Sequence, residues 1–334
     1  MIGLIMRGVI ARIEKILNSL SKKLLETLAF AFLLSLFAEF YYLFDLFSHF
    51  TLQYAIGGFI LTVMCLYFRR YLYAAVAIFI ALFSVVESRL NLQDPSQFTA
   101  PGGQADYRLI TYNHNYARTT FDRIADYFLS SEGMADIVVF QEATARTVAQ
   151  AEKLSAVYPY QIHEPQERAF GMMLISRYEF IESEKIVLAG PYYMSFALRV
   201  VVQPPEASEP IAVYALHPHP PSGPVAKAQR EYELQTVAAR IAEDEHENIV
   251  MMGDWNITPF SPYFKDVLDL SGLYYQAYGF MQNPTWLSIN GFKFLKIPID
   301  HMLFSDGLTQ INKYAGPAFM SDHHMLVGEY AVKD

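Results

Sequence analysis

Long apolar stretches at the start of the chain give way to short ones after residue 90. Residues 46–68 and 71–86 contain no Asp, Glu, Lys or Arg, and residues 24–44 are apolar apart from Glu26 and Glu39. A membrane-spanning helix needs about 20 mostly apolar residues. The pattern predicts about three such helices, and Glu39 must then lie near an interface or face a neighbouring helix.

Basic residues favour three spans over two. With three, the Lys and Arg of residues 7–23 and the pair Arg69-Arg70 fall on the same side, and the connection at 45–51 on the other side has neither. The positive-inside rule makes the basic side cytoplasmic. We therefore expect a multi-pass transmembrane region over residues 24–90, with everything after it outside the cytoplasm.

Two further segments border this region. Residues 1–23 combine basic residues with apolar ones at helical spacing, which predicts an amphipathic helix on the inner leaflet. A short frayed extension is the alternative for this segment. Residues 91–106 are polar and contain two prolines and two consecutive glycines, so they are expected to form a linker.

The chain from residue 107 to 334 alternates short apolar runs with amphipathic ones. Helical spacing of apolar residues predicts helices at 118–129, 145–156, 225–243 and 263–270. Strands are expected at 108–112, 137–140, 172–175, 180–188, 196–202, 211–216, 249–252, 299–304 and 325–332. Long strand runs broken by single helices favour an α/β sandwich of mixed sheets over a simple βαβ repeat.

Charge divides the chain in the same way as hydrophobicity. The first 88 residues carry 7 basic and 5 acidic side chains, and the remainder carries 18 and 29, a net charge of −11. Non-specific nucleic-acid binding depends on neutralising phosphates, so nucleic acid is the less expected partner. The single cysteine, Cys65, excludes a disulfide framework and a cysteine-based zinc site.

Polar residues cluster where the predicted strands begin or end. They are Asn113, Gln141-Glu142, His217, Gly253-Asp254-Trp255-Asn256, Asp300-His301 and Ser321-Asp322-His323. Oxygen ligands with few imidazoles suit Mg²⁺ or Mn²⁺. Phosphoester hydrolysis needs an oriented water and a cationic clamp on the phosphate oxygens, and a His–Asp pair can orient or activate the water.

In this order, the motifs resemble the endonuclease/exonuclease/phosphatase superfamily over about residues 107–332. Residues 170–177 also resemble that family's Gly-x-x-x-x-Ser-Arg strand. The resemblance implies a four-layer α/β sandwich, with two mixed sheets flanked by helices. It also implies a metal-dependent phosphohydrolase in which water attacks directly, with no covalent intermediate.

The resemblance implies three groups of residues. The metal ligands would be Glu142, with Asn113 and Asp322 beside it. The catalytic group would be His217 as general acid, Asp254 orienting the water, Asn256 on the phosphate, and His323 paired with Asp300. Substrate binding would fall to His219, Asn256 and His323.

Each candidate also has a structural interpretation. Glu142 could be a solvated strand end, and Asp254 with Asn256 could form an Asx turn before Pro259. His219 is either a second phosphate contact or a residue of a rigid proline-rich loop. Because a strand points neighbours to opposite faces, only one of Asp300 and His301, and one of His323 and His324, should face the site. The resemblance selects Asp300 and His323, so His301 and His324 are expected to be structural or peripheral.

Residues 273–297, between the Asp254 and Asp300 motifs, are rich in Tyr, Phe and Trp. The segment is expected to be ordinary core, an insertion that dips into the outer leaflet, or a surface for base stacking. The acidic charge of the domain argues against base stacking.

The N-terminal region and the His-Pro-x-Pro-Pro sequence at 217–221 resemble one branch of the superfamily, the membrane-bound bacterial proteins that include teicoplanin-resistance proteins. This resemblance implies a site at the outer face of the bacterial cytoplasmic membrane, acting on a phosphoester or pyrophosphate of a lipid or lipid-linked substrate. The alternatives are an exported metal-dependent nuclease and a catalytically silent, membrane-tethered binding module.

Overall fold

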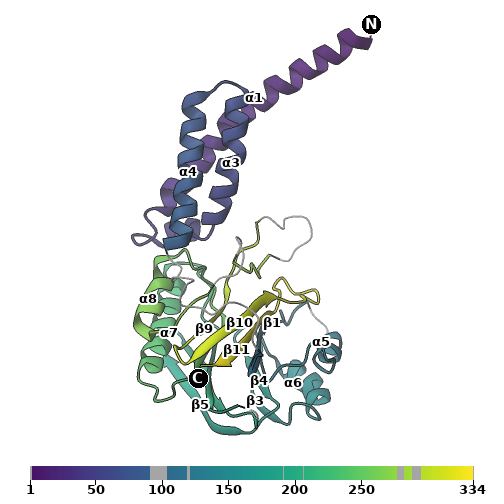
Figure 1. Cartoon of the computed structure of the whole chain (residues 1–334), viewed down its shortest axis with the longest axis vertical. Coiled ribbons are helices and arrows are strands. Elements are labelled where there is room, and N and C mark those ends of the chain that lie inside the picture. The colour runs from purple at the N-terminus through teal and green to yellow at the C-terminus, as the bar shows by residue number, and fades with distance from the viewer. Residues whose placement is uncertain are drawn as a thin grey trace. The chain divides into compact units, whose positions relative to one another are not determined.

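The computed structural model describes residues 2–90, 104–118, 121–190, 192–205, 207–276, 282–287 and 295–333. Two compact units are present (Figure 1): residues 1–91 with 260–262, and the remainder. Part of the aromatic segment expected at 273–297 and most of the expected linker lie outside the described residues.

The first unit is helical. It contains α1 (Ile2–Ser35), α2 (Tyr42–Ser48), α3 (Thr51–Tyr67) and α4 (Tyr71–Leu90). The helix expected at 24–44 is instead divided: its first part continues the basic N-terminal segment within α1, and α2 follows after a turn and the extended residue Tyr41. Gly58 of α3 lets the backbone of α4 approach closely, because a Cβ there would lie 2.8 Å from the Ala77 oxygen.

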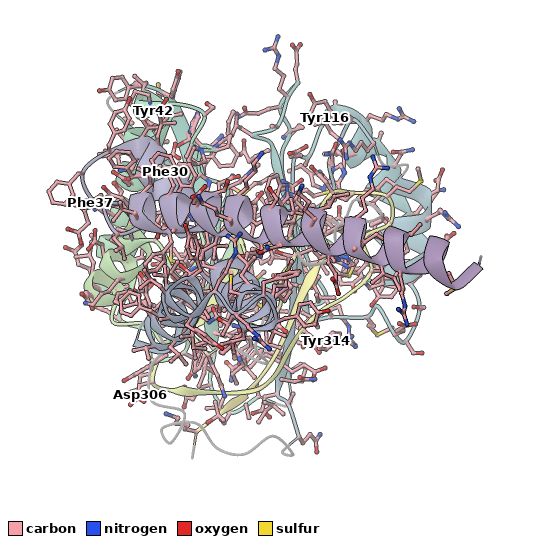
Figure 2. All side chains as sticks on the ribbon, turned by 90° about the horizontal axis from the view of Figure 1, so that it is seen from above. Phe30, Phe37, Tyr42, Tyr116, Asp306 and Tyr314 are labelled. Carbon is pink, nitrogen blue, oxygen red and sulfur yellow. The ribbon has the colours of Figure 1, made fainter. Side chains whose placement is uncertain are left out.

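Many apolar side chains of this unit point outward. Leu72, Phe79 and Val86 of α4 are more than half exposed, as is Val63 of α3. Phe30 of α1 and Phe37 after it, both labelled in Figure 2, are exposed too. Their exposure leaves a large apolar surface without a protein partner in the described residues.

By length and composition, one described helix could cross a membrane. It is α4, whose residues Tyr71–Ser88 have a mean hydropathy of 1.9. The pair α2 and α3, bent by 59° at their junction, would provide a second span if it acts as one. A core helix of a soluble protein can meet the same criteria, and α1 does not meet them, so the three-span arrangement stays a prediction.

The second unit is built on two mixed sheets. The first has strand order β10-β11-β1-β2-β4-β3 and the second β5-β6-β7-β8-β9. The strands are β1 (Tyr107–Asn113), β2 (Ile137–Gln141), β3 (Tyr160–Glu164), β4 (Met172–Ser176), β5 (Phe180–Ala189), β6 (Met194–Val202), β7 (Ile211–Leu216), β8 (Ile249–Asp254), β9 (Asp300–Phe304), β10 (Leu308–Ala315) and β11 (Leu326–Val332). The pairs β1–β2 and β7–β8 are parallel and the other pairs antiparallel.

Helices cover the outer faces of both sheets. α5 (Phe121–Phe128) and α6 (Ala145–Ala151) pack on the first sheet, and α7 (Pro224–Ala242) and α8 (Pro262–Ser271) pack on the second. Apolar residues from the inner faces of the two sheets form a third core between them. The predicted four-layer α/β sandwich is therefore confirmed.

Gly253, in β8 just before Asp254, is required by close packing. Its φ is +154°, and a Cβ would lie 1.9 Å from the Leu216 oxygen of the neighbouring strand. Gly253→Ala is expected to destabilise the domain by roughly 2–5 kcal/mol, through backbone strain and overpacking. Thermal unfolding of the purified protein would measure this. Gly8→Ala, exposed on α1 with no atom near its Cβ, is the control and should not lower the unfolding temperature.

Candidate active site

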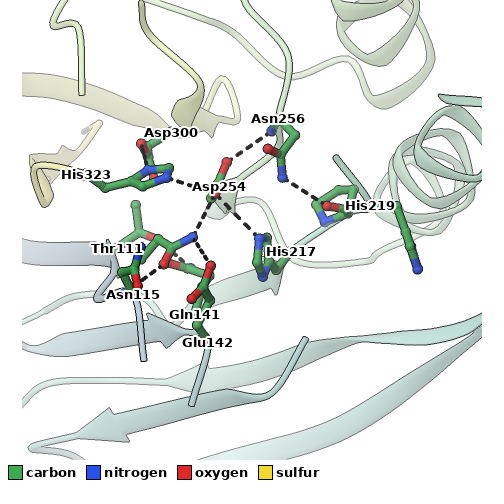
Figure 3. A network of polar contacts seen from close by, with 12 residues as sticks. Thr111, Asn115, Gln141, Glu142, His217, His219, Asp254, Asn256, Asp300 and His323 are labelled. Atoms are coloured by element: carbon green, nitrogen blue, oxygen red, sulfur yellow. Dashed lines mark hydrogen bonds and ion pairs between the residues drawn. The ribbon is translucent and has the colours of Figure 1, made fainter. Parts of the chain in front are cut away.

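Strand ends bring polar side chains to one edge of the two sheets (Figure 3). Asn113 ends β1 and Glu142 follows its parallel neighbour β2, while His217 follows β7 and Asp254 ends the parallel β8. β9 runs the opposite way and begins at Asp300, which is paired with Asp254 in the ladder. The two sheets therefore meet at these residues, as the strand-end pattern predicts.

Asp254 is the centre of the group. Its Oδ2 accepts a hydrogen bond from Asn113 Nδ2 at 3.0 Å and lies 3.5 Å from His217 Nε2 and 3.6 Å from His323 Nε2. Burial alone would raise the pKa of Asp254, but the two imidazoles and the amide together hold it well below its usual range. Asp254 is therefore a buried, ionised carboxylate.

His323 is held between two carboxylates. Its Nδ1 lies 2.9 Å from Asp300 Oδ2, its Nε2 faces Asp254, and its backbone N–H donates to Ser321 Oγ at 3.0 Å. Burial acts to lower the pKa of His323, but the charges of Asp300 and Asp254 raise it to about 10. Burial, together with the charge of Asp254, raises the pKa of Asp300. The site therefore carries a cationic imidazole at neutral pH.

This shift makes the stability of the metal-free protein depend on pH. The pKa of His323 is about 10 in the folded state against 6.5 for an ordinary histidine, so its contribution is complete below about pH 6.5 and is lost as the pH rises towards 10. The unfolding temperature in EDTA should fall over this interval, and His323→Gln should flatten the fall. His163→Gln, at an exposed position of β3, should keep the wild-type profile.

His217 contacts the other side of the central carboxylate. Burial acts to lower its pKa, but the hydrogen bond and charge of Asp254 and the charge of Glu142 raise it above the ordinary value. Its Nδ1 is buried and has no hydrogen-bond partner in the part of the chain that the structure describes. The ring can therefore carry a proton beside Asp254.

Three side chains have the spacing of a metal site. Ligand atoms of Asp254, Asp300 and His323 all lie within 4.8 Å of one another, and all three residues are buried. Glu142 is close by, because its Oε1 accepts from the same Asn113 amide nitrogen, at 3.2 Å, that donates to Asp254. Carboxylates in this number suit a hard divalent cation.

The predicted metal ligands differ in how they face this site. Glu142 has a left-handed backbone, with φ of +63°, and burial raises the pKa of its carboxyl. Asn113 turns its amide nitrogen to the carboxylates and its oxygen to the backbone N–H of Asn115, so metal ligation would need the amide reversed. Asp322 accepts from Asn115 Nδ2 at 2.6 Å and lies near enough to raise the pKa of His323.

The Asx turn considered for the Asp254 segment is present. The backbone N–H of Asn256 donates to Asp254 Oδ1 at 3.1 Å, and Asn256 has a φ of +53°. The side-chain amide donates to the Pro218 oxygen at 3.1 Å, which ties this turn to the loop after His217. The turn and the polar site therefore share the same aspartate.

His219 lies in that loop and is held by a residue outside the strand-end pattern. Its Nδ1 lies 2.8 Å from Glu233 Oε1, and its backbone N–H donates to Glu233 Oε2 at 2.9 Å. Glu233 is 1% exposed on α7. The sequence pattern missed it because a buried acid within a helix carries no strand-end signal.

Several neighbouring residues have structural roles. His301 is fully buried among aromatic rings, with Nε2 2.7 Å from the Ile257 oxygen, and His324 Nδ1 lies 2.8 Å from the Gly316 oxygen. Trp255 packs in the core beneath the second sheet. Trp286 forms a β-bridge with His323. These contacts agree with the expectation that His301 and His324 lie away from the site.

A two-sheet α/β sandwich with carboxylates, an amide and imidazoles at one edge defines a metal-dependent hydrolase of phosphoester bonds. The sequence model of the Endonuclease/Exonuclease/phosphatase family matches residues 110–323, and the chain belongs to this family. The predicted family and enzyme class are thereby confirmed. No curated protein sequence matches the chain.

Three solved structures illustrate the similarity of the fold. Sphingomyelinase C from Streptomyces griseocarneus is 16% identical, with a TM-score of 0.50, over 67% of this chain and 98% of its own. Staphylococcus aureus beta toxin with bound magnesium ions is 17% identical, with a TM-score of 0.53, over 67% and 99%. D. rerio TDP2 with a single-strand DNA product is 16% identical, with a TM-score of 0.55, over 68% and 99%. At these identities the likeness establishes the fold alone.

Proposed function

We propose that the protein is a membrane-anchored phosphohydrolase that uses Mg²⁺ or Mn²⁺ to cleave a phosphoester or pyrophosphate of a lipid or lipid-linked substrate. The observation that carries this proposal is the contact of Asn113, His217 and His323 with the single carboxylate of Asp254. Two carboxylates and a cationic imidazole around one point suit a phosphate group and its attacking water.

The pKa shifts indicate a different catalytic role for each of these residues. The lowered pKa of Asp254 makes it a weak base. Its role is therefore to orient the attacking water by a hydrogen bond rather than to accept a proton from that water. The His323 imidazolium would donate to a phosphate oxygen through Nε2 while Asp300 holds Nδ1. His217, with its raised pKa, would give a proton to the leaving oxygen. Asn256 would contribute to phosphate binding from the adjoining turn.

A divalent cation fits the donor set. Glu142 and Asp254 accept from the same Asn113 amide nitrogen and so offer two neighbouring carboxylates, whereas His323, as an imidazolium, donates hydrogen bonds and is not a ligand. Such a cation supplies charge neutralisation on the phosphate and lowers the pKa of water. The magnesium ions bound by the similar beta toxin support Mg²⁺, with Mn²⁺ as the alternative. We propose Glu142 as the principal ligand, with Asn113 and Asp322 assisting.

The N-terminal unit supports the choice of a lipid substrate. Its apolar side chains are exposed on α3 and α4, and α4 is long enough to cross a bilayer. Tethering a domain at a membrane raises its effective concentration towards lipid headgroups. The similar sphingomyelinase C has a name that denotes a lipid substrate. We place the catalytic domain at the outer face of a bacterial cytoplasmic membrane, as in the membrane-bound branch that the sequence resembles.

Turnover by the full-length protein in detergent tests the proposal. With Mg²⁺ it should release phosphate from a polyprenyl pyrophosphate or cleave a lipid phosphodiester, and EDTA should abolish the activity. If no lipid, nucleotide or nucleic-acid phosphoester is hydrolysed, the proposal is contradicted and the catalytically silent binding module is favoured. A reporter fused to the C-terminus should be active only outside the cytoplasm, and a cytoplasmic signal would contradict the topology.

A nuclease is the second candidate. The similar TDP2 structure holds a single-strand DNA product, which shows that this fold can accommodate DNA. The net charge of −11 after residue 88 opposes the binding of a polyanion. Cleavage of plasmid DNA without activity on lipid phosphates would favour the nuclease over the lipid phosphohydrolase.

A further inference from the structure

A second histidine–carboxylate pair lies beside the catalytic group. In Figure 3, His217 and His219 lie on the opposite side of Asp254 from Asp300 and His323. Glu233 bonds both the ring and the backbone N–H of His219, and it also accepts hydrogen bonds from Ser195 and from Gln229, the latter at 3.0 Å. Four hydrogen bonds to one buried carboxylate fix the ring orientation of His219.

The same helix fixes the turn opposite this histidine. Gln229 Nε2 donates to the Tyr193 oxygen at 3.1 Å, and its Oε1 accepts from the backbone N–H of Tyr192 and of Tyr193 at 3.3 Å. Gly190 permits this approach, because a Cβ there would lie 2.2 Å from Gln229. α7 therefore sets the position of the β5–β6 turn as well as that of His219.

Aromatic rings pack on the histidine that these contacts position. Tyr193 stacks on His219 with ring centroids 4.8 Å apart and an interplanar angle of 14°, and Phe170 lies 4.3 Å away at 30°. Phe170 also lies 5.8 Å from the ring of His217. A continuous set of rings thus leads from the catalytic group to Tyr193, which is 48% exposed.

The chemistry of the free ring atom defines a ligand. Glu233 holds Nδ1 of His219, and no described residue bonds Nε2, so Nε2 is left to form a hydrogen bond with a ligand. We propose that His219, Phe170 and Tyr193 form a subsite for a hydroxyl-bearing organic group attached to the reacting phosphate, such as a polyol headgroup. The proposal rests on the proposed function and names the part of the substrate beyond the phosphate.

Other ligands fit this subsite less well. An acyl chain would leave Nε2 unpaired beside apolar atoms, and a phosphate oxygen alone would leave the rings of Phe170 and Tyr193 without a partner. A nucleobase could stack on Tyr193, but it would bring with it the polyanion that the acidic domain opposes. A hydroxyl can either donate to Nε2 or accept from it, and the carbon atoms that carry the hydroxyl pack on the rings.

Binding to the full-length protein with Mg²⁺, measured by calorimetry, tests the subsite without requiring turnover. Glycerol 1-phosphate is compared with ethyl phosphate, which has the same phosphate and no hydroxyl. The wild type should bind the first about tenfold more tightly, the value of one good hydrogen bond. His219→Gln and Glu233→Gln should each remove most of this preference, and Tyr193→Leu part of it. His163→Gln should keep it.

The outcomes separate this inference from the proposed function. Equal binding of the two ligands by the wild type, or a preference that survives in His219→Gln, would overturn the subsite even if lipid phosphates are hydrolysed. A preference that requires His219 would support the subsite even if no tested lipid is turned over. Thymidine monophosphate could instead bind more tightly than glycerol 1-phosphate. If that preference is lost in Tyr193→Leu and kept in His219→Gln, the rings bind a nucleobase and the proposed hydroxyl subsite is overturned.

Discussion

Replacing Asp254 by Asn should lower kcat on any accepted phosphoester by about 10³-fold, the effect of losing a positioned water-orienting group. The substitution keeps the shape of the side chain but removes the charge that His217 and His323 face at 3.5 and 3.6 Å. It also lowers the pKa of His323, whose rise depends in part on Asp254, so the cationic clamp weakens too. Initial rates at saturating substrate and Mg²⁺ would measure the loss.

The matched control is Asp269→Asn, on the exposed face of α8. It should leave kcat at the wild-type value. Because Asp254 is buried, its variant must also retain a cooperative unfolding transition for the rate to be interpreted. A folded Asp254→Asn protein with wild-type kcat would remove this residue from the catalytic group.

Glu142→Gln is expected to weaken Mg²⁺ binding at least about tenfold and to lower kcat by about 10²-fold at a fixed, subsaturating metal concentration. The amide keeps one oxygen but loses the charge that balances the cation. Burial raises the pKa of Glu142 in the metal-free protein, so Glu142 holds its proton to a higher pH than an ordinary glutamate. Mg²⁺ must displace that proton in order to bind. The Kd for Mg²⁺ from calorimetry should therefore decrease as the pH rises.

Glu243→Gln, exposed at the end of α7, is the control for this substitution and should bind Mg²⁺ like the wild type. Excess Mg²⁺ should recover part of the activity of Glu142→Gln, because the defect lies in affinity. A variant with unaltered Kd and unaltered kcat would exclude Glu142 as a ligand.

The centre of the site could be predicted from sequence because it is built from strand ends. An apolar run that stops at a polar residue marks the end of a buried strand, and parallel neighbours then bring their ends together. This argument located Asn113, Glu142, His217 and Asp254. Alternation along β9 predicted that only one of Asp300 and His301 faces the site, and the family resemblance selected Asp300. In the structure Asp300 contacts His323 and His301 faces the core.

The features that were missed have no such signal. β3 is a half-exposed edge strand, and β10 is an edge strand with an irregularity between Gln310 and Asn312, so neither shows a clean alternation. Residues 36–41, between α1 and α2, contain no glycine or proline that would mark the break. Glu233 is an acid among other charged residues of α7, and only its tertiary contacts with His219 and Ser195 distinguish it.

The chain contains only two tryptophans, and both adjoin the catalytic group. Trp255 directly follows Asp254 and packs 5.1 Å from the ring of His301, while Trp286 is bridged to His323. Intrinsic emission excited at the indole band therefore comes from the immediate surroundings of the catalytic centre. The protein thus carries its own optical probe, which needs no label to follow the occupancy of the site.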